Sequence, residues 1–439
     1  MPTTGTADRT SAVKDFLSRG TKAALAVFLA GSKVLLFFSA LSGYAPEVAA
    51  SYGSALTLLL VCLTLGTAYQ VLVVSRLRRD TLLKDPERTA ELAATVLAGS
   101  VFLALGALAA SGAALAFQHS PGLFAAFLLT YLPAVLLAPV TYAAGGVLLV
   151  TGQEGVRLRT SAENFVAHAL LAAAVFLWEP SPVVALVVIG AGCSLVDLAT
   201  LVRTVVRTEP QARAAVLRSV REGARRMWSA PVLRAVPGSF AGALDALVLV
   251  AAFAVVSQVV TVLPAAQAAA ALACIAVVRT LVVPLKPYGM VAGRLLRASG
   301  ADLREQARRL RLFTASTALL LWPLALVFLA LPGPVAGLLG LEADPVVLWG
   351  VRLVGAQLLL EPCAGFLSSV LKVVVAPHAT VRSLVVVLWC GALPAIGLLA
   401  VSGHLTLVSL WSVLLLARAG FALASLISAR RALTAPEEV

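Results

Sequence analysis

Eight charged side chains of this 439-residue chain lie five or more residues inside long apolar stretches. If such a stretch crosses a bilayer, a charge near its centre costs about 2.5–3.5 kcal/mol, so each charge needs a physical reason. Asp245 and Glu361 are the two acids placed deepest in their stretches. Carboxylates that share a desolvated pocket cannot all stay ionised, which suits them to take up and release a proton or a sodium ion. We therefore predict cation coupling by Asp245 and Glu361.

The other intramembrane charges allow two interpretations. They are Lys33, Asp197, Arg279, Lys286, Arg352 and Arg418. The bases Lys33, Arg279, Lys286 and Arg352 are candidates for lining a substrate cavity. In the alternative interpretation, the acids neutralise Arg279 or Arg352 as buried structural pairs, because a lone charge is worse than a paired one. Asp197 and Arg418 lie nearer the ends of their stretches, which favours structural pairing or an interfacial position.

The composition indicates that these stretches lie in lipid. The chain is 60% hydrophobic and 13% charged, with a mean hydropathy of +0.96, whereas soluble domains keep roughly 25% charged residues. Apolar segments of 20 or more residues recur from Lys22 to Ser428, each long enough to cross a ~30 Å hydrocarbon core as a helix. They do not alternate polar with apolar residues, so helices are favoured over a barrel. We predict an all-α polytopic membrane protein.

Twelve helical spans are predicted. They lie near residues 22–42, 48–75, 92–117, 122–150, 160–178, 182–202, 237–260, 264–293, 312–331, 346–371, 383–402 and 405–429.

The net charge of +13 follows the positive-inside rule. Of the 34 lysines and arginines, 29 lie in the two tails or in every second loop, and the other loops carry acids alone. Basic loops mark the cytoplasmic side, where they face anionic lipid, so both termini are predicted to be cytoplasmic. A nucleic-acid partner is not expected. The Ala-, Leu- and Arg-rich composition favours a bacterial inner membrane, and the protein is expected to be a monomer.

The first apolar stretch follows Lys22 at full length, so no cleavable signal peptide is predicted. The five cysteines show no C-x-x-C spacing and the four histidines are scattered, so no metal or cofactor is predicted.

A basic segment, 203–236, divides the spans into two sets of six. Adding 218 maps Pro46 and Arg76 of the first half onto Pro264 and Arg294 of the second. An offset of 223 likewise aligns the fourth and tenth spans. Because each half has an even number of spans, the repeats enter the membrane in the same direction, which is typical of transporters with a midplane site. The predicted organisation is a tail (1–21), an N-lobe (22–202), the linker (203–236), a C-lobe (237–429) and a second tail (430–439).

Motifs of a membrane enzyme are absent from the sequence. There is no D-x-x-x-D or D-D-x-x-D for a magnesium-bound pyrophosphate, no G-x-S-x-G elbow and no P-loop. Transport is therefore expected to be powered by a gradient or by a partner, and enzymatic activity is not expected.

The start of the second half resembles exporters of the MATE (multidrug and toxic compound extrusion) family. The resemblance rests first on Pro237, which precedes Asp245 by eight residues. The next span ends in a turn, Gly293-Arg294-Leu295, which Gly300 follows. The third motif is Glu361-Pro362, followed by Leu371-Lys372. It implies twelve helices in two lobes, and an antiporter that admits sodium ions or protons and expels small amphipathic molecules by alternating access. It assigns cation coupling to Asp245 and Glu361.

The sequence departs from the family at two places. The acid of the family's first span falls near Leu36, where the nearest charge is Lys33, and Val373-Val374-Val375 replaces a small Gly-containing turn. The wider multidrug/oligosaccharidyl-lipid/polysaccharide exporter superfamily also contains flippases of lipid-linked saccharides. A cavity lined by the four bases would suit such a pyrophosphate client, since arginine binds phosphate through two hydrogen bonds. This is the alternative function.

Overall fold

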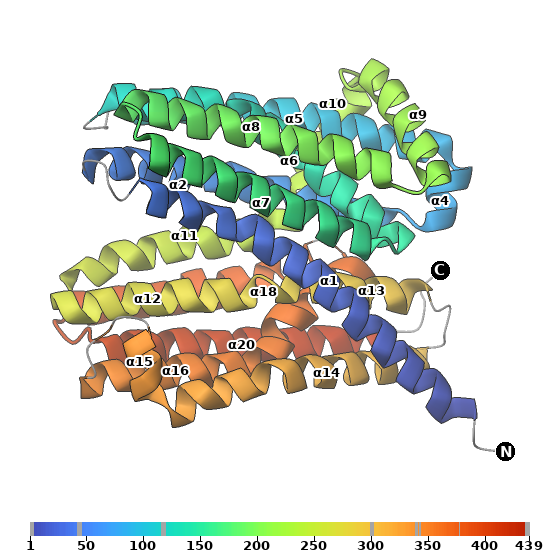
Figure 1. Ribbon diagram of the computed structural model, residues 1–439. Helices are drawn as coiled ribbons and strands as arrows, with labels where there is room; N and C mark the ends of the chain where they lie inside the picture. The colour runs from blue at the N-terminus through green and yellow to red at the C-terminus, as the bar shows by residue number, and fades with distance from the viewer. Residues whose placement is uncertain are drawn as a thin grey trace. The chain divides into compact units, whose positions relative to one another are not determined.

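The computed structural model describes residues 4–41, 46–115, 120–298, 303–338, 341, 344–376 and 378–434, and these residues are almost entirely helical, with no strand among them (Figure 1). The side chains of some residues within these helices, among them Asp245 and Arg279, lie outside the described part. The predicted all-α fold is confirmed.

Each of the twelve predicted spans falls on a helix or on a broken helix. The unbroken ones are α1 (Thr4–Ala40), α5 (Pro86–Leu115), α6 (Pro121–Thr151), α7 (Glu154–Trp178), α8 (Pro182–Arg207), α14 (Leu303–Ala330) and α20 (Leu407–Thr434). The broken ones are α2 (Pro46–Gly66) with α3 (Ala68–Arg76), α10 (Ala230–Ser239) with α11 (Leu244–Val259), α12 (Ala265–Val282) with α13 (Leu285–Ala298), α16 (Pro345–Glu361) with α17 (Leu367–Val374), and α18 (Val381–Val385) with α19 (Leu393–Val401).

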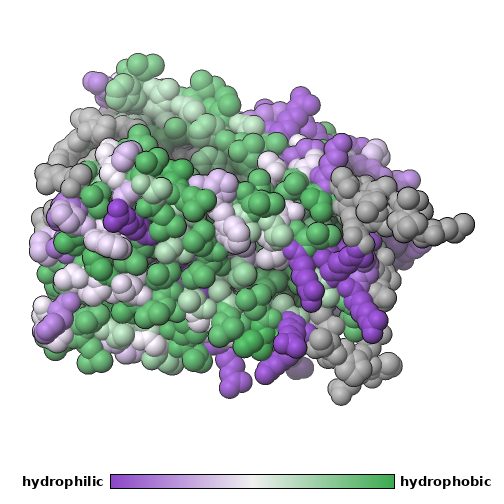
Figure 2. Space-filling view, turned by 90° about the horizontal axis from the view of Figure 1, so that it is seen from below, coloured by the Kyte–Doolittle hydropathy of each residue, from purple (hydrophilic) through white to green (hydrophobic). Residues whose placement is uncertain are grey.

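The connecting helices are α4 (Arg79–Lys84), α9 (Pro210–Arg226) and α15 (Pro332–Leu338). Among the described residues, eight helices are long and apolar enough to cross a membrane, or nine if the bent pair α10–α11 is one span. Large apolar side chains such as Leu319, Leu398 and Val401 are 73%, 72% and 91% exposed, and hydrophobic residues cover much of the face in Figure 2. Such a surface suits contact with lipid rather than water.

The chain divides into two compact units, one of residues 25–244 (the N-unit) and one of residues 1–24 with 245–439 (the C-unit). The basic segment 203–236 was predicted to be a linker, yet its helices α9 and α10 pack on α5 within the N-unit. A Cβ at Gly223 of α9 would lie 2.7 Å from the backbone nitrogen of Ala94, so glycine permits this close approach. Helix α9 thus buries its small residues and presents its arginines outward.

Both units repeat the same internal arrangement. In the N-unit α6 is packed by α2, α3, α5 and α8, and in the C-unit α16–α17 is packed by α12, α13, α14 and α20. The α2–α3 helix breaks at Gly66–Thr67 and the α12–α13 helix breaks at Val283–Pro284. Because Gly66 and Pro284 are related by the 218-residue offset, the break falls at nearly the same place in both repeats.

The crossing of α3 on α6 has its counterpart in the crossing of α13 on α17. A Cβ at Gly146 of α6 would lie 2.9 Å from Val73 Cβ, and a Cβ at Gly289 of α13 would lie 2.5 Å from the backbone oxygen of Phe366 and from Ser369 Cβ. Both crossings therefore need a glycine, which stands on α6 in one unit and on α13 in the other. The 223-residue offset places Ser369 where Gly146 stands.

Candidate functional site: two buried ion pairs

Lys33 and Asp197 form an ion pair inside the N-unit. The Nζ of Lys33, on α1, lies 3.1 Å from Asp197 Oδ1 and 3.0 Å from Oδ2, on α8. The two side chains are 17% and 20% exposed. Both residues belong to apolar spans, where each charge alone would be costly, and the pair offsets that cost. Sequence reasoning placed Lys33 in a cavity and Asp197 in a structural pair, and the structure brings these two residues together.

Helix α7 completes a polar cluster around Asp197. Asn164 Nδ2 donates to Asp197 Oδ1 at 3.0 Å and lies 2.9 Å from Thr200 Oγ1. His168, one turn further on, is fully buried and donates from Nδ1 to the backbone oxygen of Asn164 at 2.8 Å. Its Nε2 has no hydrogen-bond partner among the described residues and lies 4.0 Å from Asp197 Oδ1. We call Lys33, Asn164, His168, Asp197 and Thr200 the Asp197 cluster.

The Asp197 cluster combines one carboxylate with three nitrogen-bearing side chains of different chemistry. The carboxylate accepts hydrogen bonds from an ammonium and an amide, and an imidazole nitrogen without a partner stands beside it. Because Nδ1 donates to the backbone oxygen of Asn164, Nε2 is the ring nitrogen that faces the carboxylate. The cluster thus places an ammonium, an amide and an imidazole around one carboxylate.

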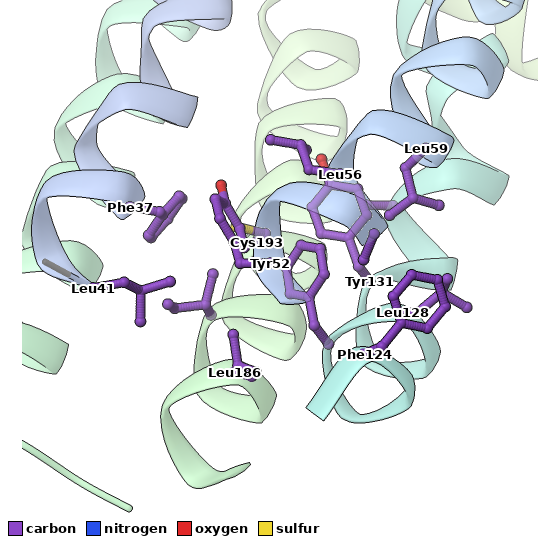
Figure 3. Packing of buried hydrophobic residues seen from close by; sticks show 14 of the residues in the cluster. Phe37, Leu41, Tyr52, Leu56, Leu59, Phe124, Leu128, Tyr131, Leu186 and Cys193 are labelled. Atoms are coloured by element: carbon purple, nitrogen blue, oxygen red, sulfur yellow. The ribbon is translucent and has the colours of Figure 1, made fainter. Parts of the chain in front are cut away.

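An apolar wall closes one side of the Asp197 cluster. The ring of Phe37 lies 5.9 Å from that of His168 and 6.4 Å from that of Tyr52, which in turn lies 4.9 Å from Phe127. Figure 3 shows Phe37, Tyr52 and Cys193 within the buried core that α1, α2, α6 and α8 build. Because these side chains exclude water, charges in the cluster interact more strongly than they would in solvent.

A second ion pair lies in the C-unit. Glu361, at the end of α16, is 0% exposed, and the Arg418 side chain on α20 is 12% exposed. Arg418 Nε donates to Oε1 at 2.7 Å and Nη2 donates to Oε2 at 2.5 Å. This bidentate geometry is the strongest form of the pair. A Cβ at Gly365 would lie 2.7 Å from Glu361 Oε2, so the glycine leaves room for the carboxylate.

The remaining predicted residues do not join these pairs in the described structure. Arg352 on α16 stacks over the ring of Trp349, with its Cζ 5.0 Å from the ring centroid. Lys286 is half-buried on α13. The side chains of Asp245 and Arg279 lie outside the described part. The alternative interpretation paired the acids with Arg279 or Arg352, whereas Glu361 pairs with Arg418 in the structure.

Sequence reasoning missed Asn164 and His168. Their i, i+4 spacing within a span predicts that they share one face of α7, and two polar residues on one face of an apolar helix are a signal of a polar partner. The partner itself, on α8, cannot be read from spacing.

Comparison with known proteins shows the fold and not the sequence family. No protein-family model matches the chain, and no curated protein matches it. Among solved structures, a MATE protein in a bent conformation has a TM-score of 0.80 at 13% identity, covering 97% of this chain and 96% of that chain.

Two further structures agree. An outward-facing multidrug resistance MATE family transporter has a TM-score of 0.74 at 13% identity and covers 98% of this chain and 97% of its own. A MOP superfamily transporter from Pyrococcus furiosus Vc1 (DSM3638), described as having a binding pocket of reverse polarity, has a TM-score of 0.77 at the same identity and coverage. The chain therefore has the MATE transporter fold over nearly its whole length, as the resemblance in its second half implied.

Proposed function

We propose that this protein is a secondary active transporter of a bacterial cell membrane, with both termini cytoplasmic, that exports small amphipathic molecules in exchange for protons or sodium ions. The likeness to MATE transporters over 97% of the chain supports the transporter class. The observation that carries the coupling is the Lys33–Asp197 pair, because it lies within apolar spans and still keeps 17% and 20% exposure.

The coupling step is a competition for a carboxylate. A proton or sodium ion that reaches Asp197 weakens its bond to the Lys33 ammonium, and Asn164 continues to hold the carboxyl group. Loss of the ion pair changes the relative energies of two arrangements of α1 and α8, and a ligand shifts such an equilibrium only through this difference. His168, 4.0 Å away, is placed to hold the proton before or after transfer.

The C-unit has its own proposed coupling acids, Asp245 and Glu361. Glu361 is fully buried beneath Arg418, so a cation reaches it after Arg418 has moved. Asp197 is more exposed than Glu361, so of these two carboxylates it meets the coupling ion first, and Glu361 would follow in a second arrangement of the C-unit.

The test is transport of ethidium into proteoliposomes that contain the purified protein, under an imposed pH or sodium gradient. Asp197→Asn, Asp245→Asn and Glu361→Gln should each lower gradient-driven uptake by about 5- to 150-fold, the range of ordinary coupling free energies. The matched control is Glu209→Gln, since Glu209 pairs with Arg79 at 2.7 Å but is 33% exposed and lies outside the spans. Uptake that is unchanged in all three variants would defeat the proposal.

The alternative function is a flippase for lipid-linked saccharides or another anionic lipid-linked precursor. It is favoured by Lys33, a base that is the charge nearest to Leu36, where the family's first-span acid falls, and by the likeness to a transporter with a reverse-polarity pocket. In this case Lys33→Ala or Arg279→Ala should impair export of a cell-surface polymer and leave drug accumulation normal.

Asp197→Asn separates the two functions. It would free the Lys33 ammonium for an anionic client and so preserve flipping, but it would abolish cation-coupled export. Normal polymer export in Lys33→Ala and Arg279→Ala cells would exclude the flippase.

A further inference from the structure

The first part of α1 is docked on the C-unit. Phe16 is fully buried, stacked on Phe313 with ring centroids 4.5 Å apart and edge-on to Tyr288 and Phe366 at 5.7 and 6.0 Å. The hydroxyl groups of Thr21 and Tyr288 lie 2.5 Å apart. The segment 1–21, predicted to be a tail, is therefore helical from Thr4 and is held against α13 and α14.

This docking leaves a groove between α1 and α14. Its volume is about 830 Å³, and it is lined by the apolar Val13, Leu17 and Leu312 and by the polar Lys14, Ser18, Thr21 and Lys22. The two lysines and Ser18 follow one another at i, i+4 and i+8, so they form one row on α1. The groove thus has an apolar wall and a cationic edge.

The cationic edge is not neutralised within the described structure. Asp15, the acid closest in sequence to both lysines, bonds Arg19 on the same helix. Lys14 and Lys22 are exposed and have no carboxylate partner among the described residues. An anion is therefore the complement that this edge lacks.

The apolar wall continues along α14 beyond the groove. Leu312, Leu319 and Leu326 follow at seven-residue intervals and lie on one face, with Leu319 and Leu326 73% and 57% exposed. From Leu312 to Leu326 the helix rises about 21 Å at 1.5 Å per residue. Because one leaflet of a bilayer is roughly 15 Å of hydrocarbon, this stripe is long enough to accompany a whole acyl chain.

We infer that this groove binds an anionic phospholipid, with its phosphate between Lys14 and Lys22 and an acyl chain along the α14 stripe. Zwitterionic lipid is disfavoured because its head group brings a cation to the lysines. Free phosphate lacks the chain that the apolar wall would cover. The site is independent of the coupling acids.

The test is native mass spectrometry of the purified full-length protein in detergent with dioleoyl phosphatidylglycerol, dioleoyl phosphatidylcholine or glycerol phosphate. Phosphatidylglycerol should bind at least tenfold more tightly than phosphatidylcholine, and glycerol phosphate should not compete with it. Lys14→Gln/Lys22→Gln should weaken phosphatidylglycerol binding by about 10- to 30-fold, since each basic residue near an anionic surface contributes about one factor of five. Leu17→Trp, which fills the groove but keeps both lysines, should weaken phosphatidylglycerol binding as well.

The control is Arg78→Gln/Lys84→Gln, which removes the same charge from exposed positions of the N-unit and should leave the affinity unchanged. Equal binding of the two lipids, competition by glycerol phosphate, or full binding by the double lysine variant would each overturn the inference.

Discussion

Replacing Arg418 with methionine should lower the free energy of unfolding by about 3–5 kcal/mol, because Glu361 would remain fully buried without its cation. Reversible unfolding in mixed detergent–SDS micelles measures this change. The matched comparison is Arg226→Met, since Arg226 pairs with Glu222 at 2.6 Å but both side chains are more than 40% exposed. A pair of that kind contributes about 0–1 kcal/mol.

The double variant Arg418→Met/Glu361→Gln should recover much of the lost stability, because it removes the unpaired charge together with its partner. If Arg418→Met were no more destabilising than Arg226→Met, the buried pair would not be the constraint on α16 and α20 that its geometry indicates.

Breaking the Lys33–Asp197 pair should stop coupled transport whichever partner is removed. Lys33→Met leaves a carboxylate held by Asn164 alone, and Asp197→Asn leaves an ammonium in an apolar span. Each single variant should therefore lose gradient-driven ethidium uptake. Each should also lose stability, by less than Arg418→Met does, because this pair keeps 17% and 20% exposure.

The double variant Lys33→Met/Asp197→Asn tells a coupling role from a structural one. It should recover stability, since no charge is left unpaired, but it should not recover transport, since no carboxylate is left to exchange a cation. Both quantities are measured on the same purified protein, transport after reconstitution into proteoliposomes and unfolding in mixed detergent–SDS micelles. Recovery of transport in the double variant would mean that the pair is structural alone.

The helical spans and the repeat of two six-helix halves could be predicted from the sequence. Hydropathy locates each helix because lipid tolerates few polar backbone or side-chain groups. The 218-residue offset, found from Pro46 and Arg76, also relates Gly66 to Pro284, where the structure breaks the two equivalent helices. It also marked Lys33 and Glu361 as residues that need a reason, since a charge in an apolar span is costly.

Sequence reasoning could not assign the partners of these charges. Lys33 and Asp197 are 164 residues apart, and Glu361 and Arg418 are 57 apart. Periodicity gives the face on which a residue stands but not the helix that this face meets. For that reason Arg418 was predicted to be an interfacial or structural residue, and the alternative to coupling by Glu361 was a pair with Arg279 or Arg352.

The helical part of 1–21 was hidden for a different reason. Its charges, Lys14, Asp15 and Arg19, made this segment resemble a solvated tail, although Asp15 and Arg19 neutralise each other within one turn. The buried Phe16 between them is a single residue, too little to show as a hydrophobic pattern. The groove beside it was therefore beyond prediction.

The glycines at the two helix crossings have a consequence for how the halves have diverged since duplication. Each crossing has a glycine at its close contact, and that glycine stands on α6 in one half and on α13 in the other. The halves are thus no longer interchangeable parts. A chimera carrying α13 in place of α3 would set glycine near glycine and leave a void, and the reciprocal graft would bring Val71 against Ser369 and force the helices apart.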